Sequence, residues 1–306
     1  MKILVTGGAG FIGSHVAEAL LAEGHSVHVI DDLSGGKEEN VPSEAVFHKA
    51  DIRSDEIRPL FGEERFEMVV HHAAQMDVRR SVADPRFDAD VNVLGFLNLM
   101  EAGRESGLRK VVFASTGGAI YGEPEYVPQN EQHPLRPLSP YGITKLCTER
   151  YLYYYEQEWS IPYVALRYAN VYGPRQNPHG EAGVVAIFAE RMLEGRQPVI
   201  YGDGEQTRDY VFVGDVVRAN VRAVAFEGSG AFNVGTGKET NVNELFRKIR
   251  DRIDGTIEEV HEAGRPGEQR RSVLDYSHSS KVLGWQPRTT LEEGLDETVA
   301  WFKKKF

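Results

Sequence analysis

The sequence predicts an α/β protein built on a doubly wound parallel sheet, with a second, smaller α/β domain after it. Short apolar runs alternate with longer helical patterns up to about residue 172, and a glycine-rich loop directly follows the first run. The turn residues Gly173, Pro174 and Pro178 then break this rhythm. A chain of 306 residues has room for one large domain and a small one.

Six strands are expected in the first part of the chain, because each segment is a short apolar run with a helical pattern or turn residues beside it. They are Lys2–Thr6, Ser26–Asp31, Ala45–Asp51, Glu67–Ala73, Lys110–Ser115 and Tyr163–Tyr168. Strands that alternate with helices in this way form parallel sheets with helices on both faces.

Three helices are expected between these strands, at Ser14–Glu23, Asn92–Glu105 and Tyr141–Trp159. In the second helix, Leu94 and Leu97 fall on the inward face. The third helix has a clear start, because Ser139 can cap it and Pro140 suits its first position.

The elements after residue 173 are shorter and mixed. Helices are expected near 184–195, 215–226, 242–253 and 291–303, and strands near 198–201 and 210–213. We therefore expect residues 1–173 to form the first domain, with part of about 208–236 returning to it. Residues 174–306 are expected to form most of the second domain.

The composition excludes several classes of protein. The formal net charge is −11 and the sequence shows no basic patch, so no nucleic-acid partner is expected. One cysteine permits no internal disulfide, which suits a reducing compartment and predicts a cytoplasmic protein. No stretch approaches 18 apolar residues, and the N-terminus does not read as a signal peptide, so no membrane partner is expected. The ten histidines show neither HExxH nor HxH spacing, so no metal site is expected.

Glycines spaced three apart, Gly7, Gly10 and Gly13, form the loop after the first strand. Glycine allows a tight strand-to-helix turn and lets backbone N–H groups approach a pyrophosphate, which the helix N-terminus also attracts. A plain turn would use glycine too. The position between a strand and a helix, however, is the context that a Rossmann-type dinucleotide site requires. Phe11 and Ile12, inside this loop, would then line the cofactor.

An acidic residue ends the second strand. Asp31 lies 18 residues after Gly13, where a carboxylate can bind the adenosine ribose hydroxyls and repel a 2′-phosphate, so NAD is favoured over NADP. A cap on a loop would also explain Asp31 and Asp32. Asp51 ends the third strand, where a contact to adenine and a capping role both fit.

Tyr141 and Lys145 lie four residues apart, and hence on one face of their helix. A free tyrosine titrates at about pH 10, but a nearby cation and the positive ring of a bound nicotinamide favour its phenolate. Such a pair is usually structural by itself. Here the fold supports a catalytic role for the pair, and so do the hydroxyls of Ser115 and Thr116. These two residues lie at the strand end where open α/β sheets bind ligands.

Five segments together resemble the extended short-chain dehydrogenase/reductases. They are TGGAGFIG at Thr6–Gly13, ASTGGAIYG at Ala114–Gly122, SPYGITK at Ser139–Lys145, RYANVYGPRQ at Arg167–Gln176 and YGDGEQTRDYVFVGDV at Tyr201–Val216. The last two are similar to the members that act on nucleotide sugars, above all the UDP-glucose 4-epimerases. The resemblance runs from Lys2 to about Trp285.

The resemblance implies roles for individual residues. Tyr141 would take the proton from the sugar 4-hydroxyl, Lys145 would hold the nicotinamide ribose and lower the Tyr141 pKa, and Thr116 would hydrogen-bond the same hydroxyl. The first domain would bind NAD and the second the nucleotide sugar. The other residues implied to line NAD are Asp51, Ile52, Ala73, Ala74, Gln75, Asn92, Ser115 and Tyr168.

The resemblance also implies contacts to the substrate. Asn170 would contact the nucleotide sugar, and Arg208 and Arg265 would bind its pyrophosphate, for which a guanidinium fork gives bidentate bonds. The alternative for Arg208 is a salt bridge to Asp209 or Asp203.

The kind of reaction is indicated by the two residues after Thr116, neither of which is acidic. Dehydratase relatives carry an Asp-Glu pair there and decarboxylase relatives a Glu, whereas this sequence has Gly117 and Gly118, which can neither take nor give a proton. The implied reaction is therefore inversion at C4 of a UDP-hexose through a 4-keto sugar. The two glycines would leave room for that sugar to rotate, and a turn with positive φ would also explain them.

The sugar itself stays open. Ser272 aligns with a family residue that gates the pocket for N-acetylated sugars, and its small size predicts that UDP-N-acetylglucosamine and UDP-N-acetylgalactosamine are accepted too. The alternatives are a 4-epimerase of another nucleotide sugar such as UDP-glucuronic acid, a dehydratase or decarboxylase, and a non-catalytic NAD-binding sensor. The joint presence of Thr116, Tyr141 and Lys145 argues against the sensor.

A homodimer is expected from the Tyr141 helix. It carries Tyr151, Tyr155 and Trp159 at i, i+4 and i+8, with further apolar residues on its flanks, so more than one side is buried. With the Asn92–Glu105 helix it would form a two-fold interface, as related enzymes do. Burial under the second domain is the alternative.

Overall fold

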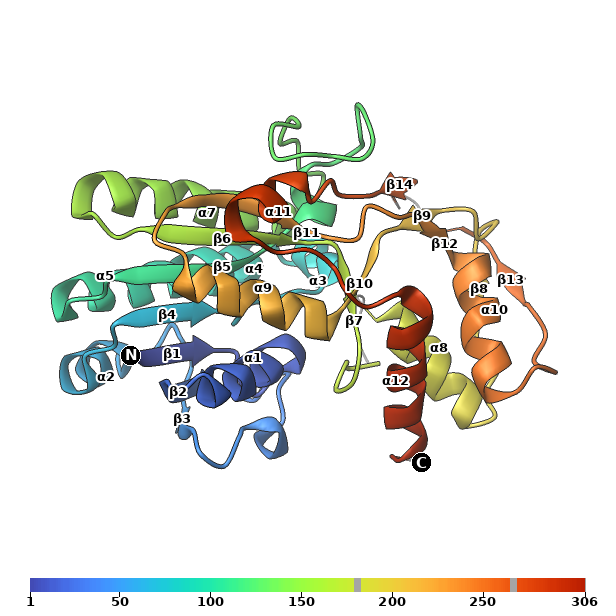
Figure 1. Cartoon of the computed structure of the whole chain (residues 1–306), viewed down its shortest axis with the longest axis horizontal. Coiled ribbons are helices and arrows are strands. Elements are labelled where there is room, and N and C mark those ends of the chain that lie inside the picture. Colours follow the sequence, from blue (N-terminus) through green and yellow to red (C-terminus); the bar gives the residue numbers. More distant parts are fainter. Residues whose placement is uncertain (179–182, 265–268, 306) are drawn as a thin grey trace.

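Seven parallel strands form the main sheet in the computed structural model, which describes residues 1–178, 183–264 and 269–305 (Figure 1). The sheet order is β11-β6-β5-β4-β1-β2-β3. The strands are β1 (Lys2–Thr6), β2 (Ser26–Asp31), β3 (Val46–Lys49), β4 (Met68–His71), β5 (Lys110–Thr116), β6 (Tyr163–Tyr168) and β11 (Gly230–Val234). The predicted parallel sheet and its six strands are confirmed. The order reverses between β1 and β4, the point at which open α/β sheets bind ligands.

Helices cover both faces of this sheet, because successive strand residues point to opposite sides. Ile3 and Val5 pack towards α1, α9 and α11, whereas Leu4 packs towards α2, α5 and α7. The helices of the first face are α1 (Phe11–Ala22), α9 (Val213–Ala225) and α11 (Ser277–Leu283). Those of the second face are α2 (Ile57–Glu64), α5 (Gly95–Ser106) and α7 (Pro140–Trp159).

The start of α7 is as predicted, but the start of α5 is not. The Ser139 hydroxyl accepts a bond from the Gly142 amide at 3.2 Å and caps α7. A π-helical turn at Asp90–Leu94 precedes α5, and its extra residue rotates Leu94 outwards, so that Leu94 is 57 % exposed instead of facing inwards. Phe96 takes the inward position.

Three smaller sheets lie in the C-terminal part of the described chain, to the right in Figure 1. They pair β7 (Asn170–Tyr172) with β10 (Tyr210–Phe212), β8 (Ile200–Tyr201) with β13 (His261–Glu262), and β9 (Thr207–Arg208) with both β12 (Thr240–Asn241) and β14 (Arg271–Ser272). Three helices, α8 (Val184–Leu193), α10 (Val242–Ile253) and α12 (Leu291–Lys303), enclose a separate apolar core there.

Short helices that the sequence did not predict pack against α7. They are α3 (Val78–Ala83), α4 (Pro85–Ala89) and α6 (Gly117–Ile120). Across the described residues, no helix combines the length and the hydropathy that a membrane span requires.

Candidate active site

The glycine loop is a backbone cradle that side chains would fill. Gly7 has a φ of +68°, and a Cβ there would lie 2.6 Å from the Ala73 amide nitrogen. A Cβ on Gly13 would lie 2.2 Å from the Gly7 carbonyl oxygen. In the described chain no side chain caps α1, so its first amides remain available to an anion. These features fit a dinucleotide pyrophosphate.

Asp31 braces this loop from the end of β2. Its carboxylate accepts bonds from the Ala9 amide at 3.0 Å and from the Leu33 amide at 2.8 Å, and burial raises its pKa. The loop-capping interpretation therefore describes a real contact, and the carboxylate stays at the edge where a ribose would lie. Asp32 accepts bonds from the amide and hydroxyl of Ser34 in a local turn.

Asp51 also has a protein partner. The Arg53 guanidinium lies 3.0 Å from its Oδ1 and holds the Asp51 pKa below its usual range. Ile52 beside it is buried, and a Cβ on Gly95 would lie 2.8 Å from its Cδ1. This segment thus fixes the start of α5 whether or not it touches adenine.

Tyr141 and Lys145 meet the end of β5. The Lys145 Nζ atom lies 5.8 Å from the centre of the Tyr141 ring and donates to the Ala114 carbonyl oxygen at 2.9 Å. Thr116 ends β5, and its hydroxyl accepts a bond from the Ala119 amide at 3.3 Å, which caps α6. The three predicted catalytic residues therefore gather at the carboxyl end of the sheet.

The pKa of Tyr141 differs from the expectation. The protein groups alone raise it above its ordinary value, first through burial and then through the charge of Asp88. Burial lowers the pKa of Lys145 to about 8, which weakens the cation that was expected to favour the phenolate. The other positive charge that was expected to favour the Tyr141 phenolate is that of the nicotinamide ring, which belongs to a ligand.

A buried network of polar side chains lies next to Tyr141 and Lys145. Its centre is Asp88, which was not predicted from the sequence to be a site residue. Asp88 accepts bonds from Gln75 Nε2 at 2.8 Å, Asn92 Nδ2 at 3.2 Å and Thr144 Oγ1 at 2.8 Å. Its i, i+4 spacing from Asn92 was a signal that could have found it. Asn92 also holds the backbone of Gln75 through two bonds of 2.8 and 2.9 Å.

Two residues expected to line NAD are engaged with the protein. The Ser115 hydroxyl donates to Glu149 at 2.6 Å, inside a buried Glu149–Arg167 ion pair of 2.7 Å. The Tyr168 hydroxyl accepts from Asn220 at 2.8 Å. The structure therefore gives both hydroxyls partners within the protein core.

The two glycines after Thr116 do not have positive φ, so that part of the expectation is wrong. They begin α6. Leu274 packs closely against Gly117, since a Cβ there would lie 2.5 Å from Leu274 Cδ1 and the leucine side chain would have to shift. Gly118 is different, since the nearest atom to its Cβ position is the Ser272 hydroxyl oxygen at 3.8 Å. Of the two glycines, only Gly118 could carry a Cβ without a clash.

The predicted substrate residues lie on the small sheets. Arg208 is in β9, which pairs with the β14 strand that contains Ser272, and Asn170 begins β7. The two alternative counter-ions of Arg208 have other partners. Asp203 pairs with Arg270 at 2.8 Å, and Asp209 is buried and accepts bonds from the Thr236, Gly237 and Leu274 amides. Arg265 lies outside the described residues.

A cluster of metal-ligand type also occurs, on β2, β3 and α2. His28 Nδ1 lies 2.9 Å from His48 Nε2, and Glu64 pairs with Lys2 at 2.9 Å. These four side chains already satisfy one another. Their wide separation in the sequence explains why no spacing pattern indicated them.

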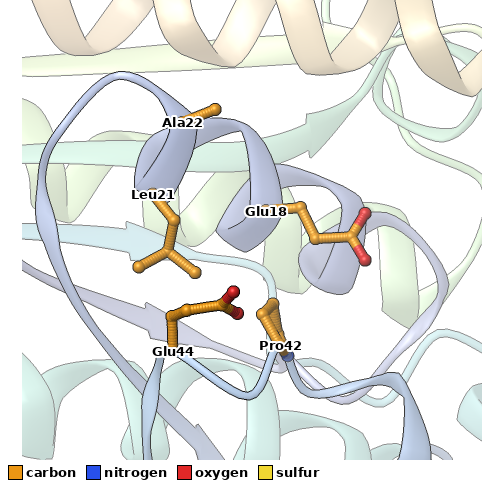
Figure 2. A pocket seen from close by; sticks show the side chains of 5 residues that line it. All are labelled: Glu18, Leu21, Ala22, Pro42 and Glu44. Carbon is orange, nitrogen blue, oxygen red and sulfur yellow. The ribbon is translucent and has the colours of Figure 1, made fainter.

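One pocket lies away from the candidate site, between α1 and the segment before β3. Figure 2 shows Leu21 pointing towards Pro42 and Glu44. With Glu18, two of its five lining residues are acidic, so it is unsuited to an anionic nucleotide.

A glycine cradle at the reversal of a parallel sheet, beside a Thr-Tyr-Lys group at the end of β5, defines an extended short-chain dehydrogenase/reductase. A model of the NAD dependent epimerase/dehydratase family matches residues 3–235, and the chain belongs to this family.

Relatives and solved structures agree over the full length. The chain is 49 % identical to a UDP-glucose 4-epimerase of Mycolicibacterium smegmatis, covering 100 % of this chain and 99 % of the relative. A UDP-glucose 4-epimerase structure from Thermotoga maritima, with UDP-glucose, has a TM-score of 0.97 at 50 % identity and covers 100 % and 99 % of the two chains. One from Thermus thermophilus, in complex with NAD, has a TM-score of 0.94 at 47 % identity and covers both chains completely.

Proposed function

We propose that this chain is an NAD-dependent UDP-hexose 4-epimerase that interconverts UDP-glucose and UDP-galactose. The observation that carries the proposal is the meeting of Tyr141, Lys145 and Thr116 beside the glycine cradle. Relatives of 47–50 % identity over the whole chain that are named UDP-glucose 4-epimerases support it.

The cofactor would be held mainly by backbone. The amides at the start of α1 would bind its pyrophosphate, Asp31 its adenosine ribose, and Lys145 its nicotinamide ribose. When bound, NAD+ supplies the acceptor for the C4 hydrogen of the sugar and then the donor that returns it. The other residues proposed to line it are Gly7, Gly10, Phe11, Ile12, Gly13, Asp32, Asp51, Ile52, Ala73, Ala74, Gln75, Asn92, Ser115, Tyr141 and Tyr168.

The side chains of this chain would move the proton. The Tyr141 phenolate takes the proton of the sugar 4-hydroxyl, while Thr116 holds the same oxygen in place. The C4 hydrogen leaves with its electron pair, and a 4-keto sugar results. After the sugar presents its other face, the electron pair and hydrogen return to C4 and Tyr141 gives the proton back to the oxygen. The charge of Lys145 stabilises the phenolate before the proton is taken and after it is returned.

The alternative eliminations need acids that this site lacks in its described part. Glycines occupy the two positions after Thr116, and Leu274 packs against the first of them. Nothing at these positions can remove a C5 proton or protonate a leaving hydroxyl. The keto sugar therefore has only the return step open to it.

The C-terminal residues would hold the nucleotide sugar. Asn170, Arg208 and Arg265 would bind it, residues 1–173 with part of 208–236 serving NAD and residues 174–306 mostly the sugar. The small side chains at Gly118 and Ser272 favour acceptance of N-acetylated UDP-hexoses as a second substrate pair.

A homodimer is also proposed, through the exposed side of α7. Tyr155 is buried in the core and donates to Glu101 at 2.7 Å. The outer face of α7 instead exposes Ile143, Tyr153 and Tyr154, each by about half its surface. Such an apolar helix face suits a two-fold contact. Sedimentation at micromolar concentration should give twice the chain mass, and a monomer alone would remove this proposal.

A cytoplasmic location is proposed as well, because the one cysteine, Cys147, is unpaired.

The test is incubation of the purified protein with UDP-glucose, UDP-galactose and their N-acetyl counterparts, with products identified by NMR. We expect interconversion within each pair. If the protein converts UDP-glucuronic acid but not UDP-galactose, the proposed substrate is wrong. If it forms a 4-keto-6-deoxy sugar, the reaction is a dehydration and not an epimerisation.

A further inference from the structure

Asp88, in α4, is a buried carboxylate that the proposed function does not use. It is 0 % exposed, and its three bonds come from Gln75, Asn92 and Thr144. Each of these partners can donate, and two of them are amide N–H groups that can only donate. The arrangement therefore suits the ionised carboxylate, which accepts on both oxygens.

The three donors come from three separate elements. Gln75 lies in the loop after β4, Asn92 in the π-helical turn, and Thr144 on α7 between Tyr141 and Lys145. The Thr144 hydroxyl also lies 3.0 Å from the Tyr141 carbonyl oxygen. Asp88 is thus the point at which the cofactor loop and the catalytic helix are tied together.

Lys145 needs a counter-charge, because this charged residue is only 4 % exposed. In the described chain it forms no ion pair, and its hydrogen bond goes to the neutral Ala114 carbonyl. The charges of two carboxylates act on it and raise its pKa, those of Asp88 on α4 and of Glu149 on its own helix. The charge of Glu149 is compensated by Arg167 at 2.7 Å, whereas all three bonds of Asp88 come from neutral groups.

The other titratable groups around Lys145 do not supply negative charge. His71, which ends β4, is buried, and His72 after it is half-buried. Desolvation lowers the pKa of both, that of His72 to about 3, so both are neutral at pH 7. In the protein without its cofactor Tyr141 carries no negative charge either, since burial raises its pKa. Asp88 is therefore the uncompensated negative charge of this part of the site.

We propose that Asp88 is a positioning residue whose buried charge keeps Lys145 protonated and whose bonds hold the start of α7 against the cofactor loop. This role rests on the proposed function, since it matters only if Lys145 acts on the cofactor ribose and on Tyr141. The same charge disfavours the Tyr141 phenolate. Asp88 thus sets both edges of the working pH range.

Loss of the Asp88 charge should shift the pH profile of the reaction in one direction. Activity requires Tyr141 without its proton, which gives the acidic limb, and Lys145 with its proton, which gives the alkaline limb. Removal of a negative charge lowers both pKa values. Both limbs of the pH profile should then move to lower pH.

Asp88→Asn tests this with little change of shape. The amide oxygen can still accept from Gln75 and Asn92, and the new NH2 can donate to Thr144, whose hydrogen turns to the Tyr141 carbonyl. We expect both limbs of the kcat profile to move down by about one pH unit. The matched control is Thr144→Val, which removes a bond to Asp88 without a charge, and which should lower kcat while both limbs stay in place.

A readout independent of turnover is NMR of protein labelled with 13C at lysine Cε, with Lys145 assigned from Lys145→Arg. We expect Lys145 to titrate at about pH 8 in the wild type and about one unit lower in Asp88→Asn. Equal titration in the two proteins would overturn the proposal. If Asp88→Asn does not fold, the titration of the wild-type protein alone tests the proposal. A Lys145 that is already neutral at pH 7 there would overturn it. Absence of epimerase activity in the wild type would instead refute the proposed function and leave this titration interpretable.

Discussion

The seven-stranded sheet and the β12-β9-β14 sheet are built differently. Strands of the large sheet have four to seven residues and are covered by helices on both faces, whereas each strand of the small sheet has two residues. The proposed chemistry depends on the first region and the proposed choice of sugar on the second. A rigid sheet suits groups that must keep their geometry, and short strands between loops tolerate change.

The largest effect is expected where the rigid region carries the chemistry. Tyr141→Phe removes the hydroxyl that takes the proton, and kcat should fall by about a thousandfold. The measurement is turnover of UDP-galactose, with bound NAD determined by absorbance as the control for folding. Turnover within about threefold of wild type would separate Tyr141 from catalysis.

The next effect concerns the cradle. Gly13→Val places a side chain where even a Cβ would lie 2.2 Å from the Gly7 oxygen, so bound NAD should be lost and stability should fall by about 1–3 kcal/mol. Gly62→Ala is the matched control, because nothing lies within 4 Å of its Cβ position in α2, and it should raise stability by about 0.5–1 kcal/mol. Denaturation and cofactor content measure both. Full NAD content in Gly13→Val would show that the glycine loop does not hold the cofactor.

In the C-terminal region, Arg208→Lys should act on binding. It replaces a guanidinium fork by a point charge, so the KM for UDP-galactose should rise about tenfold to a hundredfold while kcat changes little. Arg247→Ala is the control, since Arg247 is half exposed on α10 and pairs only at the surface with Glu259. A loss of kcat at unchanged KM would place Arg208 in the chemistry instead.

The smallest effect on the main reaction is expected at Ser272. Ser272→Tyr fills the space facing Gly118, so turnover of UDP-N-acetylgalactosamine should fall by about tenfold or more while UDP-galactose is still converted. Ser272→Ala should retain both. An equal fall for both sugars would show that this position does not discriminate between them.

The same contrast explains what could be predicted. The large strands are continuous apolar runs, so β1, β2 and β6 have the bounds that were expected. A strand of two residues has no periodicity to detect, and β9, β12 and β14 appear only when distant segments pair.

Within the large region two misses have different causes. A π-helical turn changes the phase that placed Leu94 inwards. Asp88 draws its three donors from residues 75, 92 and 144, so its role depends on the tertiary structure, although the motifs that contain Tyr141 and Lys145 were visible.

The central claim, that the C4 hydrogen leaves the sugar and returns to it inside one site, can be tested with UDP-glucose that carries deuterium at C4. The account predicts UDP-galactose that retains this deuterium, formed without added nicotinamide cofactor. Loss of the label to water, or dependence on added cofactor, would contradict it.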